Sequence, residues 1–479
     1  MKKDEKGITV SKEENFSEWY TQLIQKAELI EYSSVSGCLV LRPYAYELWE
    51  RIQDYLDKEL KKKGVKNAYF PLFIPERLLK KEKEHVEGFN PEVAWVTHTG
   101  TTKLKERLAI RPTSETIIYE SYKKWIRSHR DLPLLINQWC NVVRWEFKDA
   151  IPFIRTREFL WQEGHTVFAS EKESISFNRE IISIYKKIFE ELLSIPVLTG
   201  RKSEKEKFAG ADFTESVEAL MPNGKAVQGA TSHGLGTHFS KAFEITYLDK
   251  NEKEQYAWQN SWGFTTRSIG MVIMVHSDDK GLVLPPLLAP IQIRIIPIFV
   301  SKKEENIMKE AREIKKQLSK YRIDIDERKE YSPGWKFNEV ELKGIPLRIE
   351  IGPKDIEKKQ VIQVRRDTLK KEAIKRANLK EEIEKTLLSI QKDLFERAKK
   401  ILETQTVEVK DKLSFLKAIQ NKKIVKAQWC ATLKCEEKIK EETEGAKSLN
   451  APFDQKRIKG KCAFCTEEAK QVMYFGKSY

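Results

Sequence analysis

Apolar side chains recur at helical spacing in the segment that begins at Pro43. The apolar positions are Tyr44, Leu48, Ile52, Leu56 and Leu60, each four residues after the last. This repeat places them on one face of a helix. Proline suits the first position of a helix, and Gly64 is typical of the residue that ends one. The pattern predicts an amphipathic helix over residues 43–64. A short aromatic strand follows at 68–74, and Pro71 restricts it to an edge or an interface.

Strand patterns dominate the next part of the chain. Residues 134–148 and 157–168 are rich in Val, Ile, Phe and Trp, and the loop 149–156 separates them. This predicts an antiparallel hairpin with a long tip. A helix is expected at 171–195, and further strands are expected at 237–248 and 254–263. Because strands dominate and helices surround them, we expect an antiparallel α+β domain.

The chain becomes proline-rich at residues 284–290, and its pattern changes there. Beyond this point, strands are expected at 291–300, 323–327, 346–351 and 360–366, and helices at 304–320 and 379–402. Strands that alternate with helices predict a small α/β domain. From residue 403 the chain is rich in Lys and Glu. We therefore expect three domains, over residues 1–285, 286–402 and 403–479.

The composition is that of a folded protein. Hydrophobic residues make up 40% of the chain, which excludes a disordered protein, and 21 Gly with 17 Pro exclude a fibrous one. No apolar run follows the charged start, so no secretory leader is expected. The most apolar stretch, 281–300, holds four prolines with Gln292 and Arg294, so no membrane span is expected either. The formal charge of +15 weakly favours a polyanionic partner such as nucleic acid.

Four of the six cysteines fall in the last fifty residues. Cys430 and Cys435 have four residues between them, and Cys462 and Cys465 have two. Two such pairs can bring four thiolates to one tetrahedral zinc, and a site closed by four ligands is structural. All seven histidines lie at or before His276, so no nearby histidine replaces a cysteine. Four unrelated thiols are the alternative, which the clustering disfavours. The other two cysteines make no disulfide framework, so a reducing cytosol is expected.

Charged and aromatic residues gather around the tip of the predicted hairpin. Arg144 and Glu146 are two apart, so on a strand both would point to one face. After the loop come Arg155, Thr156, Arg157 and Glu158, and then Trp161, Gln162, Glu163 and His165. These residues could form a salt-bridged sheet face in water, which the pattern alone slightly favours. Three arginines beside a tryptophan and several acids could also bind phosphate and amine groups on a rigid sheet.

Two glycine-containing segments are further candidates. Residues 228–233 (Gln-Gly-Ala-Thr-Ser-His) precede Gly234 and Gly236, and such glycines would let the backbone approach a ligand closely. Residues 262–270 include Arg267 but also fit a strand-to-helix turn with a capping Thr or Ser. The sequence contains neither the Gly-x-x-x-x-Gly-Lys-Ser/Thr phosphate loop nor a dinucleotide fingerprint after a strand. Any ATP is therefore expected on the antiparallel sheet.

These segments resemble the three motifs of the class II aminoacyl-tRNA synthetases. The helix at 43–64 with residues 69–75 resembles motif 1, residues 144–146 with 155–165 resemble motif 2, and residues 263–267 resemble motif 3. Thr266 stands where motif 3 usually has an acidic residue. Residues 111–115 (Arg-Pro-Thr-Ser-Glu) narrow the resemblance to the prolyl-tRNA synthetases of the archaeal/eukaryotic type.

The resemblance covers nearly the whole chain, from about Phe16 to Tyr479. Residues 334–338 and 344–353 resemble the anticodon-binding domain of that group, and the paired cysteines with the final Tyr479 resemble its C-terminal zinc domain. The implied fold is a class II antiparallel-sheet catalytic domain. An α/β anticodon-binding domain and a small zinc-binding α+β domain would follow it.

The resemblance implies a ligase that activates L-proline with ATP and transfers the prolyl group to the 3′ end of tRNA(Pro). Arg144 would bridge the proline carboxylate and the α-phosphate. Arg267, helped by Arg155, would hold the γ-phosphate, and Thr156 would lie beside the adenine. The implied ATP-binding residues are Arg144, Glu146, Arg155, Thr156, Gln228, Thr231, Thr265 and Arg267. Mg²⁺ bound through Glu146 and Gln228 would neutralise the polyphosphate.

The implied proline pocket comprises Thr113, Glu115, Arg144, Trp161, Glu163 and His233. Glu115 is the first choice for the partner of the ammonium, and a flat pyrrolidine suits an aromatic wall. Glu341, Arg348 and Lys354 are candidates to read anticodon bases. The resemblance also implies a homodimer that forms through motif 1 and acts in the cytoplasm. Only 62 residues separate His165 from Gln228, so no hydrolytic editing domain is expected there.

Two other functions compete with this interpretation. One is a related synthetase for threonine or serine, which the pairing of Thr113 and Glu115 with Trp161 and Glu163 argues against. The other is a synthetase-like regulator that binds tRNA without charging it. Such proteins usually lack the motif arginines, whereas both are present here.

Overall fold

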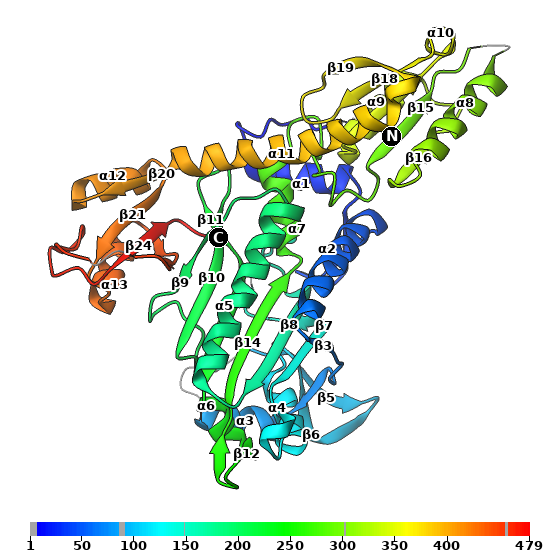
Figure 1. Cartoon of the computed structure of the whole chain (residues 1–479). Coiled ribbons are helices and arrows are strands. Elements are labelled where there is room, and N and C mark those ends of the chain that lie inside the picture. Colours follow the sequence, from blue (N-terminus) through cyan, green and yellow to red (C-terminus); the bar gives the residue numbers. More distant parts are fainter. Residues whose placement is uncertain (1–6, 86–91, 148, 301–302, 456–457) are drawn as a thin grey trace.

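The computed structural model describes residues 7–85, 92–147, 149–300, 303–455 and 458–479. Figure 1 shows a large sheet with helices packed on it, flanked by two smaller regions of mixed helix and strand. The long helix α11 (Leu379–Gln405) runs between the two smaller regions. The chain therefore has the mixed helix and sheet architecture that the sequence predicts.

The helix predicted from the four-residue repeat is α2 (Pro43–Lys62). Leu48, Ile52 and Leu56 are fully buried in the main core. The other elements ahead of the sheet are α1 (Phe16–Lys26), β1 (Ile30–Tyr32), β2 (Leu39–Leu41), β3 (Lys66–Asn67), β4 (Phe73–Pro75), α3 (Glu76–His85), β5 (Trp95–Thr99), β6 (Thr102–Ile110), α4 (Glu115–Trp125) and a 3₁₀ turn (His129–Asp131). The strand expected at 68–74 is wrong over most of its length, since only Phe73 and Ile74 of it lie in a strand, β4. β3 and β4 lie on either side of Pro71, which has no N–H to give to a ladder.

The large sheet has the strand order β23-β9-β10-β11-β14-β8-β7-β3 and is antiparallel except for the β3–β7 pair. Its main strands are β7 (Leu134–Val143), β8 (Glu158–Phe168), β9 (Leu198–Arg201), β10 (Phe213–Leu220), β11 (Ala226–Gly236) and β14 (Trp258–Thr265). The predicted hairpin is the β7–β8 pair, in which Leu134 lies opposite Val167 and Val143 lies opposite Glu158.

Helices α2, α5 (Glu171–Lys187) and α7 (Arg267–His276) cover one face of this sheet (Figure 1). A π-turn at Ile188–Leu192 continues α5, and together they match the helix expected at 171–195. Ser232 on β11 donates a hydrogen bond to Asn178 on α5, so Ser232 points toward the helices. Because side chains alternate along a strand, Thr231 and His233 point to the opposite face.

The strand expected at 237–248 is wrong over most of its length. The structure has α6 (His238–Phe243), followed by β12 (Thr246–Leu248), which pairs with β13 (Glu254–Tyr256). Phe239, Ala242 and Phe243 are three and four residues apart, which is a helical period. The rings of Phe239 and Phe243 pack edge-on against Tyr119.

The second sheet has the order β16-β15-β17-β18-β19, with parallel pairs at β16–β15–β17 and antiparallel pairs beyond. Its elements are β15 (Ile293–Pro297), α8 (Glu304–Gln317), β16 (Ile323–Ile325), α9 (Pro333–Lys343), β17 (Leu347–Ile351), α10 (Pro353–Glu357), β18 (Gln360–Arg365), β19 (Lys371–Lys375) and a 3₁₀ turn (Arg376–Asn378). This confirms the alternation of helices and strands, whereas α9, α10 and β19 were not anticipated.

The third sheet has the order β20-β21-β24-β22. Its elements are β20 (Thr406–Val409), α12 (Lys412–Gln420), β21 (Ile424–Trp429), α13 (Leu433–Glu442), β22 (Lys447–Ser448), β23 (Ala451–Pro452) and β24 (Gln471–Gly476). β23 leaves this sheet and pairs with β9, so the C-terminal region adds an edge strand to the large sheet. No described helix has both the length and the apolar character that crossing a bilayer requires.

Candidate active site

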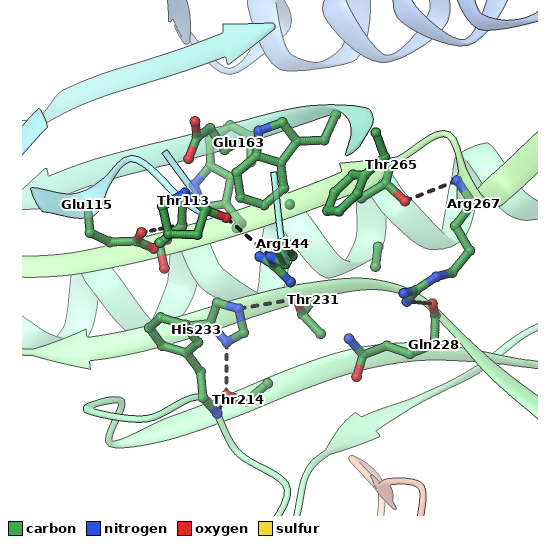
Figure 2. Close-up of a pocket in the computed structure, with 18 of the residues that line it drawn as sticks. Thr113, Glu115, Arg144, Glu163, Thr214, Gln228, Thr231, His233, Thr265 and Arg267 are labelled. Atoms are coloured by element: carbon green, nitrogen blue, oxygen red, sulfur yellow. Dashed lines mark hydrogen bonds between the residues drawn. The ribbon is translucent and has the colours of Figure 1, made fainter. Parts of the chain in front are cut away.

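A cavity of about 450 Å³ lies on the face of the large sheet opposite α2, α5 and α7, the face on which α4 and α6 also pack. Strands β8, β11 and β14 supply side chains to it, and the segments just before α4 and just after β7 supply others (Figure 2). It brings together most of the candidate residues from the sequence. They are Thr113, Glu115, Arg144, Glu146, Trp161, Glu163, Gln228, Thr231, His233, Thr265 and Arg267.

Arg144 lies just beyond the last residue of β7, not on the strand as the sequence suggested. Its guanidinium stands 5.5 Å from the ring centroids of both Phe159 and Trp161, and its Nε donates to the carbonyl of Pro112 at 3.2 Å. Burial lowers the pKa of Arg144, and the nearby acidic residues, first Glu146, oppose this. Arginine keeps its charge in proteins, so the side chain is a cation at neutral pH.

Arg267 is the first residue of α7 and is fixed on several sides. Its Nε donates to the carbonyl of Ile154 at 2.9 Å, and a terminal nitrogen donates to the carbonyl of Gln228 at 3.0 Å. Its backbone N–H donates to Thr265 Oγ1 at 3.1 Å. Burial lowers the pKa of Arg267 to about 10, with a smaller contribution from Arg144. The strand-to-helix turn expected at 262–270 is confirmed, and it aims this cation into the cavity.

Glu163 is buried and has many hydrogen-bond donors. The backbone N–H of Ser114 donates to it at 3.1 Å, Gln138 Nε2 at 2.9 Å and Cys140 Sγ at 3.4 Å. Nε2 of His165 is 3.1 Å from Glu163 Oε2. Burial raises the pKa of Glu163, but His165 and the other donors outweigh it, so the pKa is lowered. Burial lowers the pKa of His165, but the two glutamates outweigh it, so the pKa is raised.

Glu115 differs from Glu163 in the hydrogen bonds that its carboxylate receives. It is the first residue of α4, where the helix dipole favours a carboxylate. Among the described residues, the hydroxyl of Thr113 is the donor to its side chain. The side-chain oxygens of Glu115 and Glu163 and a ring nitrogen of His165 all lie within 4.8 Å of one another. Glu163 thus receives hydrogen bonds from several residues, whereas Glu115 receives one from Thr113.

His233 closes the cavity from β11 as a neutral ring. Thr214 Oγ1 is 2.9 Å from its Nδ1 and Thr231 Oγ1 is 3.2 Å from its Nε2 (Figure 2). The ring of Phe208 packs on it, with centroids 4.7 Å apart. Burial lowers the pKa of His233 to about 3, helped by the nearby Arg144. The imidazole is therefore held uncharged between two threonine hydroxyls.

Two glycines of the 228–236 segment also have a packing role that the sequence did not suggest. A Cβ at Gly229 would collide with the ring of Phe189, and one at Gly234 would collide with Phe213. These residues lie in the middle of β11, so the missing side chains make room for packing. On this strand the cavity is lined by Gln228, Gly229, Ala230, Thr231 and His233.

Two of the candidate ATP-binding residues lie outside this cavity. Arg155 lines an adjoining cavity of about 260 Å³, which shares Gln228 and Arg267 with the first. Thr156 lines a separate pocket beside Thr266, and its hydroxyl donates to the carbonyl of Glu158 at 2.8 Å. Arg157, the third arginine of the hairpin, packs 4.8 Å from the Trp145 ring and supports the tip.

The structure brings two of the three candidate anticodon residues together. Arg348 on β17 is buried, donates to Glu341 on α9 at 3.3 Å and to Glu350 at 3.1 Å, and stacks 4.1 Å from the Phe337 ring. Lys354 is exposed on α10, the helix after β17.

The four clustered cysteines meet in the C-terminal region. Their sulfur atoms all lie within 4.8 Å of one another, with Cys435 and Cys462 at 3.9 Å and Cys430 and Cys465 at 3.5 Å. Zinc–sulfur bonds of ~2.3 Å in a tetrahedron place sulfurs slightly less than 4 Å apart. The donor set therefore fits a structural zinc.

Comparison with known proteins gives three adjoining matches. Residues 95–276 match the tRNA synthetase class II core domain (G, H, P, S and T), and residues 292–386 match an anticodon binding domain. Residues 414–479 match the prolyl-tRNA synthetase C-terminal model. Proline–tRNA ligase 2 of Bacillus cereus is 51% identical, with 100% of both chains covered. The chain belongs to the prolyl-tRNA synthetase family.

Other members of the prolyl-tRNA synthetase family are similarly close. Proline–tRNA ligase of Alkaliphilus oremlandii is 51% identical over 98% of this chain and 97% of its own. A crystal structure of prolyl-tRNA synthetase from Cryptosporidium parvum, complexed with halofuginone and AMPPNP, superposes with a TM-score of 0.94. It is 48% identical and covers 99% of this chain and 100% of its own. As a member of the family, the chain is an aminoacyl-tRNA ligase. The threonine and serine alternatives are thereby excluded.

Sequence reasoning missed several residues of the cavity. Phe159 could have been predicted as a cavity residue. It lies two residues before Trp161 and four before Glu163, so on a strand all three side chains point to one face. Phe208 and Thr214 gave no signal, since each is an ordinary residue far along the chain from His233. Of the two residues that hold Glu163, Ser114 lies in the 111–115 segment but was not singled out, and Gln138 carries no motif.

Proposed function

We propose that the cavity activates L-proline with ATP and that the chain then transfers the prolyl group to the 3′ end of tRNA(Pro). The observation that carries this proposal is the place of Arg144. It lies between the Glu115 carboxylate, which suits an amine, and Arg267, which suits a polyphosphate. The ligase class and the prolyl family follow from the comparisons above. The roles of individual residues are the proposal.

In the first step, a carboxylate oxygen of proline attacks the α-phosphorus of ATP. The bond from that phosphorus to the bridging oxygen breaks, and pyrophosphate leaves. Negative charge builds on the phosphate oxygens, and Arg144 and Arg267 stabilise it without reorganising. In the second step, a terminal ribose hydroxyl of the tRNA attacks the prolyl carbonyl, and AMP leaves. Catalysis is then positioning and electrostatics, without a covalent enzyme intermediate.

Proline would lie with its ammonium toward Glu115 and its ring against Trp161. The indole Nε1–H donates to Cys140 Sγ at 3.2 Å, which fixes the plane of the ring. His233 is neutral and packed, so it would close the pocket without adding a cation beside the ammonium.

Mg²⁺ is the metal we propose for the triphosphate. Glu146 and Gln228 both line the cavity and carry the oxygen donors that Mg²⁺ prefers. When bound there it would neutralise phosphate charge. Thr231 and Thr265 offer hydroxyl groups to the nucleotide on the same wall.

The region around the second sheet would recognise the tRNA, and the C-terminal region would hold the zinc. Glu341, Arg348 and Lys354 remain our candidates for reading the anticodon, and Cys430, Cys435, Cys462 and Cys465 are our candidates for a structural zinc. We place the domain borders near residues 285 and 402. The second and third sheets each pack against an apolar core of their own, which supports this division.

We further propose a homodimer that works in the cytoplasm. Tyr69, Phe73 and Trp95 near the motif 1 segment are 72%, 45% and 36% exposed, which is unusual for large apolar side chains and typical of an interface. All six cysteines are free, as a reducing compartment favours. Sedimentation at several protein concentrations tests the dimer.

Exchange of labelled pyrophosphate into ATP tests the activation step. Proline is expected to support exchange, and threonine and serine are not. Arg144→Ala should lose the exchange, because removing a cation from a developing phosphate charge costs ~3 kcal/mol or more. Arg130→Ala, an exposed arginine outside the cavity, is the matched control and should behave as wild type. Full exchange in Arg144→Ala would contradict the proposal.

A further inference from the structure

A buried polar contact joins the loop between β9 and β10 to the C-terminal region. The hydroxyl of Ser203 donates to Oε1 of Glu436 at 2.8 Å, and the hydroxyl of Ser448 donates to the same oxygen. The two hydroxyl oxygens are 3.0 Å apart. Ser203, Glu436 and Ser448 are 3%, 5% and 1% exposed. Hydrogen bonds to a buried carboxylate are about twice as strong as bonds between neutral groups.

Ser203 also fixes the first turn of the loop that follows it. Its hydroxyl oxygen accepts from the backbone N–H of Glu206 at 3.2 Å, and its carbonyl accepts from the N–H of Lys207 at 3.0 Å. The carboxylate of Glu436 therefore holds the residue on which this turn is built.

The other end of the loop reaches the substrate cavity. The backbone N–H of Phe208 donates to Thr214 Oγ1 at 2.9 Å, and the Phe208 ring packs on His233. Glu206 and Phe208 both line the cavity. Phe208 in the wall of the amino-acid pocket thus lies only five positions after Ser203, which contacts Glu436.

Other contacts between the loop and the C-terminal region are weaker. Lys205 and Glu437 are 3.5 Å apart, as are Lys447 and Glu206, and all four side chains are at least partly exposed. Exposed ion pairs of this length contribute little. The Glu436 contact is buried and has two donors, so it dominates the attachment of the loop.

We propose that Glu436 is a positioning residue for amino-acid binding. It holds the start of loop 202–212 so that Phe208 stays packed on His233, and the C-terminal region thereby sets the affinity of the cavity for its amino acid. This rests on the proposed function, because it takes the cavity beside Glu115 as the proline pocket. ATP would bind farther along the sheet, at Arg267. The loop reaches the adjoining cavity there with Lys202 and Glu206 but not with Phe208, so a displaced Phe208 is expected to affect proline more than ATP.

Kinetics of pyrophosphate exchange distinguish a positioning role of Glu436 from a general loss of structure. Glu436→Ala is expected to raise the KM for proline about ten-fold, with the KM for ATP and kcat within about two-fold of wild type. Glu436→Gln keeps an acceptor oxygen and should recover most of the affinity. Ser203→Ala should give a similar rise, and the double variant should be no worse than either single one, because both remove the same contact. Glu442→Ala on the same helix, α13, pairs with Lys412 on the surface and is the matched control.

A second measurement needs no catalysis. Lys205 and Lys207 are trypsin sites within the loop, and cutting there in the ligand-free protein should be about five-fold faster in Glu436→Ala than in wild type or Glu442→Ala. Metal content should be equal in all three. An unchanged KM for proline, an equal rise in both KM values, or equal cutting rates would overturn the inference. If proline failed to support exchange even in wild type, the proposed function would fail, while the cutting rates would still test the loop attachment.

Discussion

Glu163 and His165 form a buried ion pair beneath the amino-acid pocket. Neither needs to touch the substrate to matter, because Glu163 also ties Ser114 to Gln138 and so fixes the segment that carries Thr113 and Glu115. The pKa of each side chain is shifted toward its charged form, because its neighbours outweigh the effect of burial. The protonation of the pair therefore bears on the geometry of the pocket.

The pH dependence of the pair follows from the two pKa shifts. The pKa of His165 is raised, so its contribution is complete below its unfolded value of about 6.5 and is lost as pH rises through the folded value. The pKa of Glu163 is lowered, so its contribution is complete above its unfolded value and is lost as pH falls through the folded value. The pocket is best ordered between the two folded pKa values.

We predict that the KM for proline rises several-fold on the alkaline side, as His165 loses its proton. Exchange kinetics from about pH 6 to about pH 9 measure this. His165→Gln keeps a donor for Glu163 but cannot titrate in this range, so the alkaline rise should disappear. The same profile in wild type and variant would exclude the pair as its source.

At the scale of elements, hydrophobic patterning predicted the parts that local rules determine. The repeat in α2 and the two apolar runs of the β7–β8 hairpin were recognisable, since each strand or helix repeats its own period. Helix α6 was missed because its short run of Phe and Ala also looks like a strand. The sequence could not predict the packing of Phe208 on His233 or the contact between Ser203 and Glu436, because each joins residues that are distant in sequence and share no motif. The candidate cavity residues come from separate segments, and only the family resemblance grouped them before the fold was known.

The docking of β23 on β9 depends on a glycine. A Cβ at Gly200 would overlap the carbonyl oxygen of Ala451 in the paired strand. We predict that Gly200→Ala weakens this edge, lowers the unfolding free energy by about 1–3 kcal/mol and raises the KM for proline. Gly334→Ala, where a Cβ meets nothing within 4 Å, is the control. Thermal melting and exchange kinetics of the two variants give the comparison, and equal stability would count against the role of the edge.

The cysteine cluster gives a second prediction at this scale. Cys462→Ser should lower the bound zinc and the melting temperature of the C-terminal region, because a structural metal contributes folding energy directly. Exchange at saturating proline should persist, since the residues that face the phosphates come from the large sheet. Metal analysis of protein prepared without chelator, beside differential scanning calorimetry, tests both points. Wild-type protein without zinc would contradict the assignment.

At the scale of the whole molecule, the span between His165 and Gln228 is where a domain that hydrolyses mischarged tRNA could be inserted. It contains the rest of β8, then α5, β9, β10 and the start of β11, all packed into the large sheet. No residues are left in this span for a separate hydrolytic domain. Yet alanine is smaller than proline, and each methylene in a pocket discriminates by only ~1–3 kcal/mol.

We therefore predict that the enzyme forms some Ala-tRNA(Pro) at high alanine and does not remove it. Preformed Ala-tRNA(Pro) incubated with the enzyme should decay no faster than in its absence. Faster decay with enzyme would place a hydrolytic site within this chain.

The pairing of β23 with β9 also has a consequence for the folding of the chain during translation. β9 is made after about two-fifths of the chain, but its partner strand and Glu436 emerge more than two hundred residues later. A ribosome-bound chain can assemble the inner strands of the sheet, while loop 202–212 stays without its attachment until residues 436–452 have left the ribosome. Such long-range pairing forms late and slowly. Incomplete chains would hold the arginines of the cavity but bind proline poorly, so a stalled or truncated product would be a weak competitor for the substrates of the finished enzyme.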